Sequence, residues 1–226
     1  MKKIFTATVS LLLVSCIFSQ KLSQVNLAGS AGPSFFSFLT DPDVLVRITP
    51  EGKIIDWGTE LLSQRSNYYD PKLQPYLGRV EYYGQESDSA FRGKIKSIGT
   101  CNFTYYGHYE TDTRVGKLKS IGTLNLDYYT NIDNAAFRGR LRFIGGLILE
   151  YYSSLEDEAV RGKLKEMGST PVRYYSSFED RYLKGKIKSI GSMVLEYYSS
   201  MDRIELRGLL KSGYRPNIGG VTYILQ

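Results

Sequence analysis

A unit of 23 residues recurs six times without insertion between residues 82 and 213, and this period limits the fold more than any other feature of the sequence. Each unit opens with a tyrosine pair, as at Tyr82-Tyr83 and Tyr151-Tyr152. One glycine lies ten residues after each pair, and a second glycine follows it in every unit, one residue early only at Gly213. A fixed period of this length is typical of repeat proteins, in which each unit buries its apolar face by stacking on its neighbours.

The hydrophobic pattern inside the unit has a period of two, which indicates strands. In residues 91–98 the inward positions begin with Phe91, and this first position is apolar in five of the six units. After the second glycine the alternation resumes, so the first tyrosine of each pair should face inward and the second outward. We therefore predict an all-β repeat protein, an antiparallel meander of six 23-residue β-hairpin units in one curved sheet.

The register of the predicted hairpins follows from which residues should lie opposite one another. A two-residue turn at Gly99-Thr100 would place Lys96 opposite Phe103 and mix the faces, so a three-residue loop is favoured. In that register the ring of the inward tyrosine would cover the bare backbone of Gly93 and its equivalents. The outer face would then carry the pairs Lys119 with Asp127, Arg142 with Glu150 and Lys188 with Glu196.

A parallel β-solenoid with one coil per unit is the competing fold. An unbroken period fits both architectures, and only the charge pairs across the strands favour hairpins.

The rhythm of aromatic pairs and glycines, as in Tyr151-Tyr152, Gly162 and Gly168, resembles the MORN repeat and its bacterial variants. These repeats have a similar period and form one hairpin per unit. The resemblance covers residues 82–213, although the tryptophan and the closely spaced second glycine pair of the family are absent there. It implies a curved single-layer meander with a scaffold or membrane-associated role, and it implies no catalytic residues.

The N-terminus has the features of an export signal in residues 1–20. Lys2 and Lys3 precede an apolar run that ends in small residues. Ordinary cleavage near Gln20 is the favoured processing, and a lipid anchor at Cys16, within a lipobox-like sequence, is the alternative. The expected location is therefore the periplasm, the cell surface or the secreted fraction.

Two further segments flank the repeat region of residues 82–213. Residues 21–81 are interpreted as an N-terminal lead and a diverged hairpin, formed by residues 44–49 and 53–57, that cap the sheet. Residues 214–226 are interpreted as a closing strand, because the terminal units of a repeat protein must be covered.

The sequence offers little material for catalysis. Once the signal is removed, Cys101 is the only cysteine, and its equivalents are mostly apolar, so we expect a small core residue. His108, the only histidine, occupies a position that is polar in the other units. The recurrent loop acids lack the ligand spacing of a calcium site. We predict no enzyme, no cofactor and no metal.

The predicted outer face is basic and lined with tyrosines. Three outward positions per unit hold 16 of the 29 lysines and arginines of a chain whose net charge is +6, so the cations gather on one surface. A face that repeats cations and aromatic rings suits an extended anionic partner. The candidate binding residues are Tyr106, Tyr129, Tyr152, Tyr175, Tyr198, Lys96, Lys119, Arg142, Lys165 and Lys188.

These features predict an exported, non-catalytic structural or binding protein. Its expected partner is an acidic glycan or the headgroups of a membrane surface, and nucleic acid is not expected. One alternative is a purely structural envelope scaffold without a ligand, in which the lysines only protect the sheet from aggregation. The other is a small outer-membrane β-barrel, which predicted strands of six to nine residues with uniformly short turns fit less well.

Overall fold

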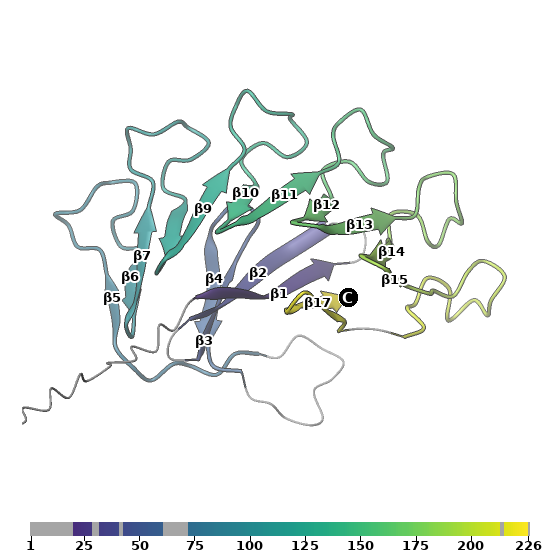
Figure 1. The fold of residues 1–226 in the computed structure, drawn as a ribbon, viewed down its shortest axis with the longest axis horizontal. Coiled ribbons are helices and arrows are strands. Elements are labelled where there is room, and N and C mark those ends of the chain that lie inside the picture. Colours follow the sequence, from purple (N-terminus) through teal and green to yellow (C-terminus); the bar gives the residue numbers. More distant parts are fainter. Residues whose placement is uncertain (1–19, 29–31, 41–42, 61–71, 213–214, 226) are drawn as a thin grey trace, which may run out of the picture.

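The computed structural model describes residues 20–28, 32–40, 43–60, 72–212 and 215–225. These residues form 17 strands in two sheets (Figure 1), which confirms the predicted all-β class. No helix in the described part of the chain is long and apolar enough to cross a membrane. The predicted export signal, with Cys16, lies outside the described residues except for Gln20.

The larger sheet, which we call the repeat sheet, contains 11 strands in sequence order. Consecutive strands pair antiparallel throughout, which confirms the predicted meander and excludes the parallel solenoid. The strands are β5 (Val80–Tyr82), β6 (Ile95–Ile98), β7 (Cys101–Tyr105), β8 (Leu118–Ile121), β9 (Leu124–Tyr128), β10 (Leu141–Ile144), β11 (Leu147–Tyr151), β12 (Leu164–Met167), β13 (Thr170–Tyr174), β14 (Ile187–Ile190) and β15 (Met193–Val194).

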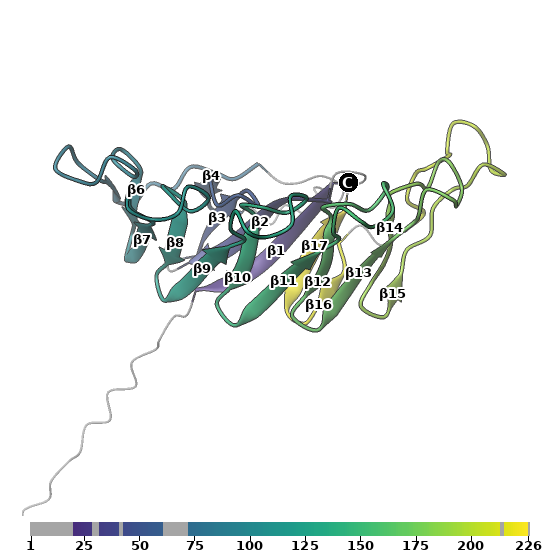
Figure 2. The same ribbon diagram turned by 90° about the horizontal axis from the view of Figure 1, so that it is seen from above.

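A second sheet of six strands, which we call the cover sheet, lies against one face of the repeat sheet (Figures 1 and 2). Its strand order is β16-β17-β1-β2-β3-β4, with β1 and β17 parallel and the other neighbours antiparallel. The strands are β1 (Lys21–Ala28), β2 (Gly32–Thr40), β3 (Val44–Ile48), β4 (Ile54–Gly58), β16 (Asn217–Ile218) and β17 (Val221–Leu225).

The sequence did not predict the cover sheet. The expected hairpin of residues 44–49 and 53–57 is present as β3 and β4, and the expected C-terminal strand is present as β17. These strands lie over a face of the repeat sheet instead of at its end, and β17 pairs with β1. The reason is burial: the inward rows of the repeats form a wide apolar surface, and the terminal strands are apolar enough to cover it, with all five residues of β3 buried.

The hydrophobic core fills the space between the two sheets. Phe103 and Leu126 of the repeat sheet pack in one cluster with Phe36 and Phe38 of the cover sheet. Burial of each such side chain contributes about 1.5–3 kcal/mol. As predicted, the first tyrosine of the pair faces this core in four units, at Tyr105, Tyr128, Tyr151 and Tyr174.

The hairpin turns contain two residues, so the predicted three-residue loop is wrong. Ile98 lies opposite Cys101, which leaves Gly99-Thr100 as the turn. The faces do not mix, because a β-bulge in the first strand of each hairpin shifts the alternation by one residue. The inserted residues are Lys96, Lys119, Arg142, Lys165 and Lys188.

The connections between hairpins are long loops along one edge of the repeat sheet (Figure 1). The loop between β7 and β8 has 12 residues, numbers 106–117, and the strands from β6 to β14 have only four or five residues. The segment 91–94, expected to be strand, therefore belongs to a loop. Each loop closes at its base: Tyr106 N–H donates to the Lys117 carbonyl and Gly116 N–H donates to the Tyr106 carbonyl, both at 2.9 Å.

Aspartate or asparagine side chains tie neighbouring loops together. The Asp157 carboxylate accepts hydrogen bonds from Ala159 N–H (2.8 Å) in its own loop and from Ser177 N–H (3.1 Å) in the next loop. The equivalent residues Asp88, Asn134 and Asp180 make the same two bonds. These recurrent polar residues therefore fix the stacking of the loops.

The glycine near the end of each loop is required by backbone conformation. Gly139 has a φ of +75°, and a Cβ there would contact the Nζ of Lys117 at 2.9 Å, with no tyrosine ring within 4 Å. The predicted cover of this glycine by an aromatic ring is therefore wrong. The positive φ lets the chain turn back toward the tyrosine pair.

We expect Gly139→Ala to lower the free energy of unfolding by about 1–2 kcal/mol, because a residue with a Cβ is strained in the left-handed region. Gly146→Ala is the matched control, since Gly146 has no left-handed φ and nothing within 4 Å of a Cβ. Both substitutions restrict the unfolded chain equally. Urea denaturation of the two variants checks the prediction, and equal losses of stability would contradict it.

Candidate functional site

Five cations were predicted as binding residues, and all five are exposed in the structure. They are Lys96, Lys119, Arg142, Lys165 and Lys188, and each is the inserted residue of a bulge. The bulge explains their exposure, because the extra residue has no partner on the neighbouring strand. The five cations therefore recur once per unit at one place on the repeat sheet.

Four of these cations, together with Lys211 of the sixth unit, lie over the second tyrosine of a pair. We call this arrangement the cation–tyrosine row, and such contacts contribute about 0.5–1 kcal/mol each at exposed sites. The distances from the cation to the ring centroid are 5.5 Å for Lys119 and Tyr106, 5.5 Å for Arg142 and Tyr129, 5.8 Å for Lys165 and Tyr152, 5.2 Å for Lys188 and Tyr175, and 5.2 Å for Lys211 and Tyr198.

The tyrosines of this row were expected to face outward, but they are half-buried, and Tyr106, Tyr129 and Tyr152 pack against the hydrophobic core. The Tyr106 hydroxyl donates to the Leu126 carbonyl at 2.9 Å, and the Tyr129 hydroxyl donates to the Leu149 carbonyl at 2.8 Å. Burial, assisted by the negative charge of Asp127, raises the pKa of Tyr106 to about 12. The hydroxyl therefore stays protonated, and each ring is fixed to the hairpin that follows it.

The charge pairs expected on the outer face are absent, because the two-residue turns change the register. Asp127 binds Arg114 instead, at 2.8 Å. In the part of the chain that the structure describes, no salt bridge involves Lys119, Arg142 or Lys165. These three cations are therefore available to an external anion.

A second row of cations, expected on the outer face, instead connects neighbouring units. Lys163 is buried, its Nζ donates to the Gly185 carbonyl at 2.6 Å, and it lies 5.0 Å from the Tyr174 ring centroid. Lys94, Lys117 and Arg140 likewise donate to the glycine carbonyl of the next unit. The predicted surface of 16 outward cations is therefore wrong.

The remaining row of predicted outward cations lies in the loops. Arg161 donates to the Glu156 carbonyl at 2.7 Å, and Arg207 donates to the Asp202 carbonyl at 2.9 Å. These contacts hold single loops in shape. The residues that present exposed charge along the sheet are therefore mainly those of the cation–tyrosine row.

The loops also carry exposed apolar residues that the sequence analysis missed. Each loop from the second unit on has one large apolar side chain that is 92–94% exposed. These residues, which we call the loop tips, are Tyr109, Ile132, Leu155, Phe178 and Met201. Their spacing of 23 residues was visible in the sequence, but the sequence did not indicate that these apolar side chains would be exposed.

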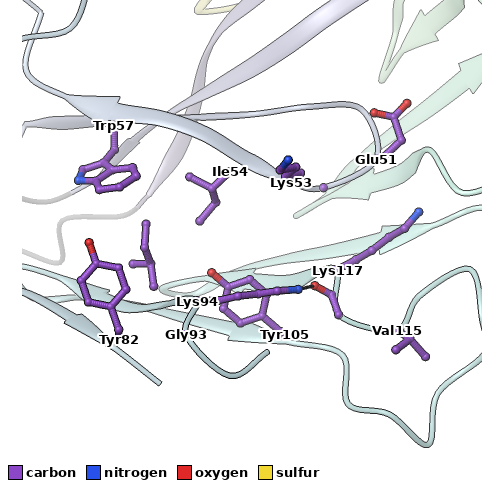
Figure 3. Close-up of a pocket in the computed structure, with 13 residues that line it drawn as sticks. Glu51, Lys53, Ile54, Trp57, Tyr82, Gly93, Lys94, Tyr105, Val115 and Lys117 are labelled. Carbon is purple, nitrogen blue, oxygen red and sulfur yellow. Dashed lines mark hydrogen bonds between the residues drawn. The ribbon is translucent and has the colours of Figure 1, made fainter. Parts of the chain in front are cut away.

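A cavity of about 420 Å³ opens between the β3–β4 turn and the first two units of the repeat sheet (Figure 3). Ile54 and Trp57 of β4 line one side, and Tyr82, Lys94 and Tyr105 line the other. The sequence analysis did not predict it, because its two sides are far apart in the chain.

The described residues contain no group of three or more His, Cys, Asp or Glu side chains that could hold a metal. His108 Nδ1 lies 2.7 Å from Asp88 Oδ2, but this carboxylate also accepts the backbone N–H groups of Ala90 and His108, so it organises a turn. Cys101 is buried, in the core position expected of it.

No protein-family model matches the sequence, and no similar curated protein or solved structure was found. Function is therefore inferred from the geometry of this chain alone.

Lys163 should make stability depend on pH, because burial lowers its pKa to about 8. A lysine in the unfolded chain has a pKa of about 10.4. Between these values the unfolded chain binds the proton and the folded chain does not, so stability rises with pH. Lys163→Met removes this contribution, and its stability should fall relative to the wild type between about pH 7.5 and pH 10.

Urea denaturation of both proteins at the two pH values measures this difference. If the wild type instead loses stability relative to Lys163→Met, the Gly185 carbonyl and the Tyr174 ring hold the proton more strongly than burial expels it.

Proposed function

We propose that this chain is an exported, non-catalytic structural or binding protein whose cation–tyrosine row binds an extended anionic partner. The observation that carries the proposal is repetition, because the same exposed cation, fixed over the same type of ring, recurs in each of five consecutive units. An enzyme needs one distinct site, whereas a repeated contact suits a partner that itself repeats.

The spacing of the row supports a polymer or a surface with regular charges. Each unit adds two strands, and strands in a sheet lie about 4.8 Å apart, so successive cations are separated by about 10 Å. This distance is comparable to one disaccharide step of an extended glycan. Anionic headgroups on a lipid surface, which rearrange freely, could also meet such a row.

The rigidity of the row supports binding as well. The tyrosines are held by hydrogen bonds to the following hairpin, and the cations lie over their rings. Less side-chain freedom is then lost when a partner binds. Lys119, Arg142 and Lys165 need not break a described salt bridge to contact an anion.

A purely structural role is the second candidate. The tyrosine hydroxyls bond the backbone of the following hairpin, and the Lys94, Lys117, Arg140 and Lys163 side chains bond the backbone of the next unit. Much of the repeated chemistry therefore serves the fold. The two candidates differ in one measurable property, the affinity of the exposed cations for a polyanion.

We expect the double variant Lys119→Gln with Lys165→Gln to bind immobilised polygalacturonate more weakly than the wild type. The slope of log affinity against log salt should fall by about one to two units, because each lost contact releases one fewer counterion. The matched control, Lys72→Gln with Arg138→Gln, removes the same charge from exposed positions off the row. Equal effects of the two double variants would favour the structural candidate.

The loop tips distinguish a lipid surface from a glycan. If lipid headgroups are the partner, Leu155→Ser with Phe178→Ser should weaken binding to vesicles of phosphatidylcholine and phosphatidylglycerol, because exposed apolar side chains enter the interface. Leu77→Ser, at a 96% exposed apolar position outside the loop tips, is the control. If a glycan is the partner, the tip variant should bind polygalacturonate as the wild type does and the protein should not bind vesicles.

A further inference from the structure

The cavity between the sheets lies where the cover sheet stops covering the repeat sheet. Tyr82, the inward tyrosine of the first unit, is 53% exposed, whereas the equivalent Tyr128 is fully buried. The β3–β4 turn passes over the repeat sheet beside this edge, and the Gly52 carbonyl accepts the Leu118 N–H at 3.4 Å. The cavity therefore has one open side and two walls formed by the sheets.

The walls of the cavity are mainly apolar and aromatic. Ile54 and Trp57 lie on the cover-sheet side, and Tyr82 and Tyr105 lie opposite them (Figure 3). Gly93 leaves further room, because nothing lies within 4 Å of the position where its Cβ would be. The volume of about 420 Å³ lies within the roughly 300–1,000 Å³ typical of small-molecule sites. Such walls accept a planar or alicyclic apolar body.

The charged groups of the cavity are predominantly cationic. Lys53, Lys94 and Lys117 line it, and the one acidic lining residue, Glu51, lies 3.9 Å from the Arg140 guanidinium. The Lys94 ammonium donates to the Gly116 carbonyl and lies 5.3 Å from the Tyr105 ring centroid, so it is fixed in place (Figure 3). An ammonium has three donors, and this contact uses one of them.

We propose that this cavity binds a small organic anion, a monocarboxylate with an aromatic or alicyclic body. The body would pack against Trp57 and Tyr105, and the carboxylate would accept hydrogen bonds from Lys94. Burial lowers the pKa of Lys94, and a bound carboxylate would offset that desolvation by restoring a partner to the ammonium. This site uses none of the exposed cations of the cation–tyrosine row, so it stands independently of the function proposed above.

Comparison of the cavity with the equivalent places in the other units indicates that it is more than a packing defect. Lys94, Lys117 and Lys163 occupy the same position of the unit and make the same bond to the next glycine carbonyl, but Lys163 does not line this cavity. Trp57 is the only tryptophan of the chain, and it lies at this site instead of in the closed core. The cavity beside the first two units therefore combines an aromatic wall with a cation held in a fixed position.

The test is titration of the full chain with 3-phenylpropanoate and with its neutral analogue 3-phenylpropanamide. Binding is followed by calorimetry and by the fluorescence of Trp57, which reports on the site because no other tryptophan is present. We expect saturable binding of the carboxylate at one site, a change in Trp57 emission, and affinity for the amide lower by roughly tenfold, as a hydrogen bond to a charged group implies.

Two variants and one control locate the site. Lys94→Met should weaken carboxylate binding by roughly tenfold, and Lys163→Met, which loses the equivalent structural bond outside the cavity, should bind as the wild type does. Val115→Trp, which adds bulk to the cavity lining, should abolish binding as measured by calorimetry, since its second tryptophan rules out fluorescence for this variant. The site can therefore be tested even if Lys94→Met does not fold.

Three results would overturn the proposal. They are the absence of saturable binding, equal affinity for the acid and the amide, and unchanged carboxylate binding by Val115→Trp. Binding to polygalacturonate is measured separately, so failure of this proposal and failure of the cation–tyrosine row are distinguishable.

Discussion

The structure depends on hydrogen bonds that join side chains of the loops to the backbone of the next hairpin or the next loop. The Tyr129 hydroxyl reaches the Leu149 carbonyl at 2.8 Å, and the Lys163 ammonium reaches the Gly185 carbonyl at 2.6 Å. Both donors would lose hydration on burial, so the carbonyl is needed to satisfy them. The tyrosine contact recurs every 23 residues, so it holds successive repeats in the same relative position and fixes the spacing of the exposed cations.

The sequence predicted the hairpins but placed one residue wrongly, and the reason is physical. Ile95 and Ile98 are both buried, yet strict alternation sends residues three apart to opposite faces. The hairpin therefore needs a shift of one residue somewhere. A three-residue turn lies beyond Ile98 and would leave that side chain on the outer face, whereas the structure places the shift inside the strand, as the bulge at Lys96, and buries Ile98. Strict alternation along the strand could not predict this bulge, because it depends on pairing with the preceding strand.

The candidate site was predictable in part for a related reason. Lys96 and its equivalents were correctly expected on the surface, whereas Lys94 and its equivalents were not correctly placed, although both positions are basic in the first five units. A lysine has a long apolar stem, so the same letter serves an exposed charge and a half-buried donor. What separates them is the glycine of the next unit, whose carbonyl lies within reach only once the units are stacked. That contact depends on tertiary structure, as does the half-burial of the second tyrosines.

The cover sheet shows how a repeat array of this size is made into a closed core without a cap of the repeat type. Strands from both ends of the chain, β1 and β17, pair in parallel and lie over the inward face of the repeats. Six strands cannot cover eleven completely, so an inward residue of the first unit, Tyr82, remains half exposed at the uncovered edge. Repetition thus produces a regular outer surface, and the mismatch in width between the sheets leaves a concave site lined by aromatic and cationic side chains at the uncovered edge.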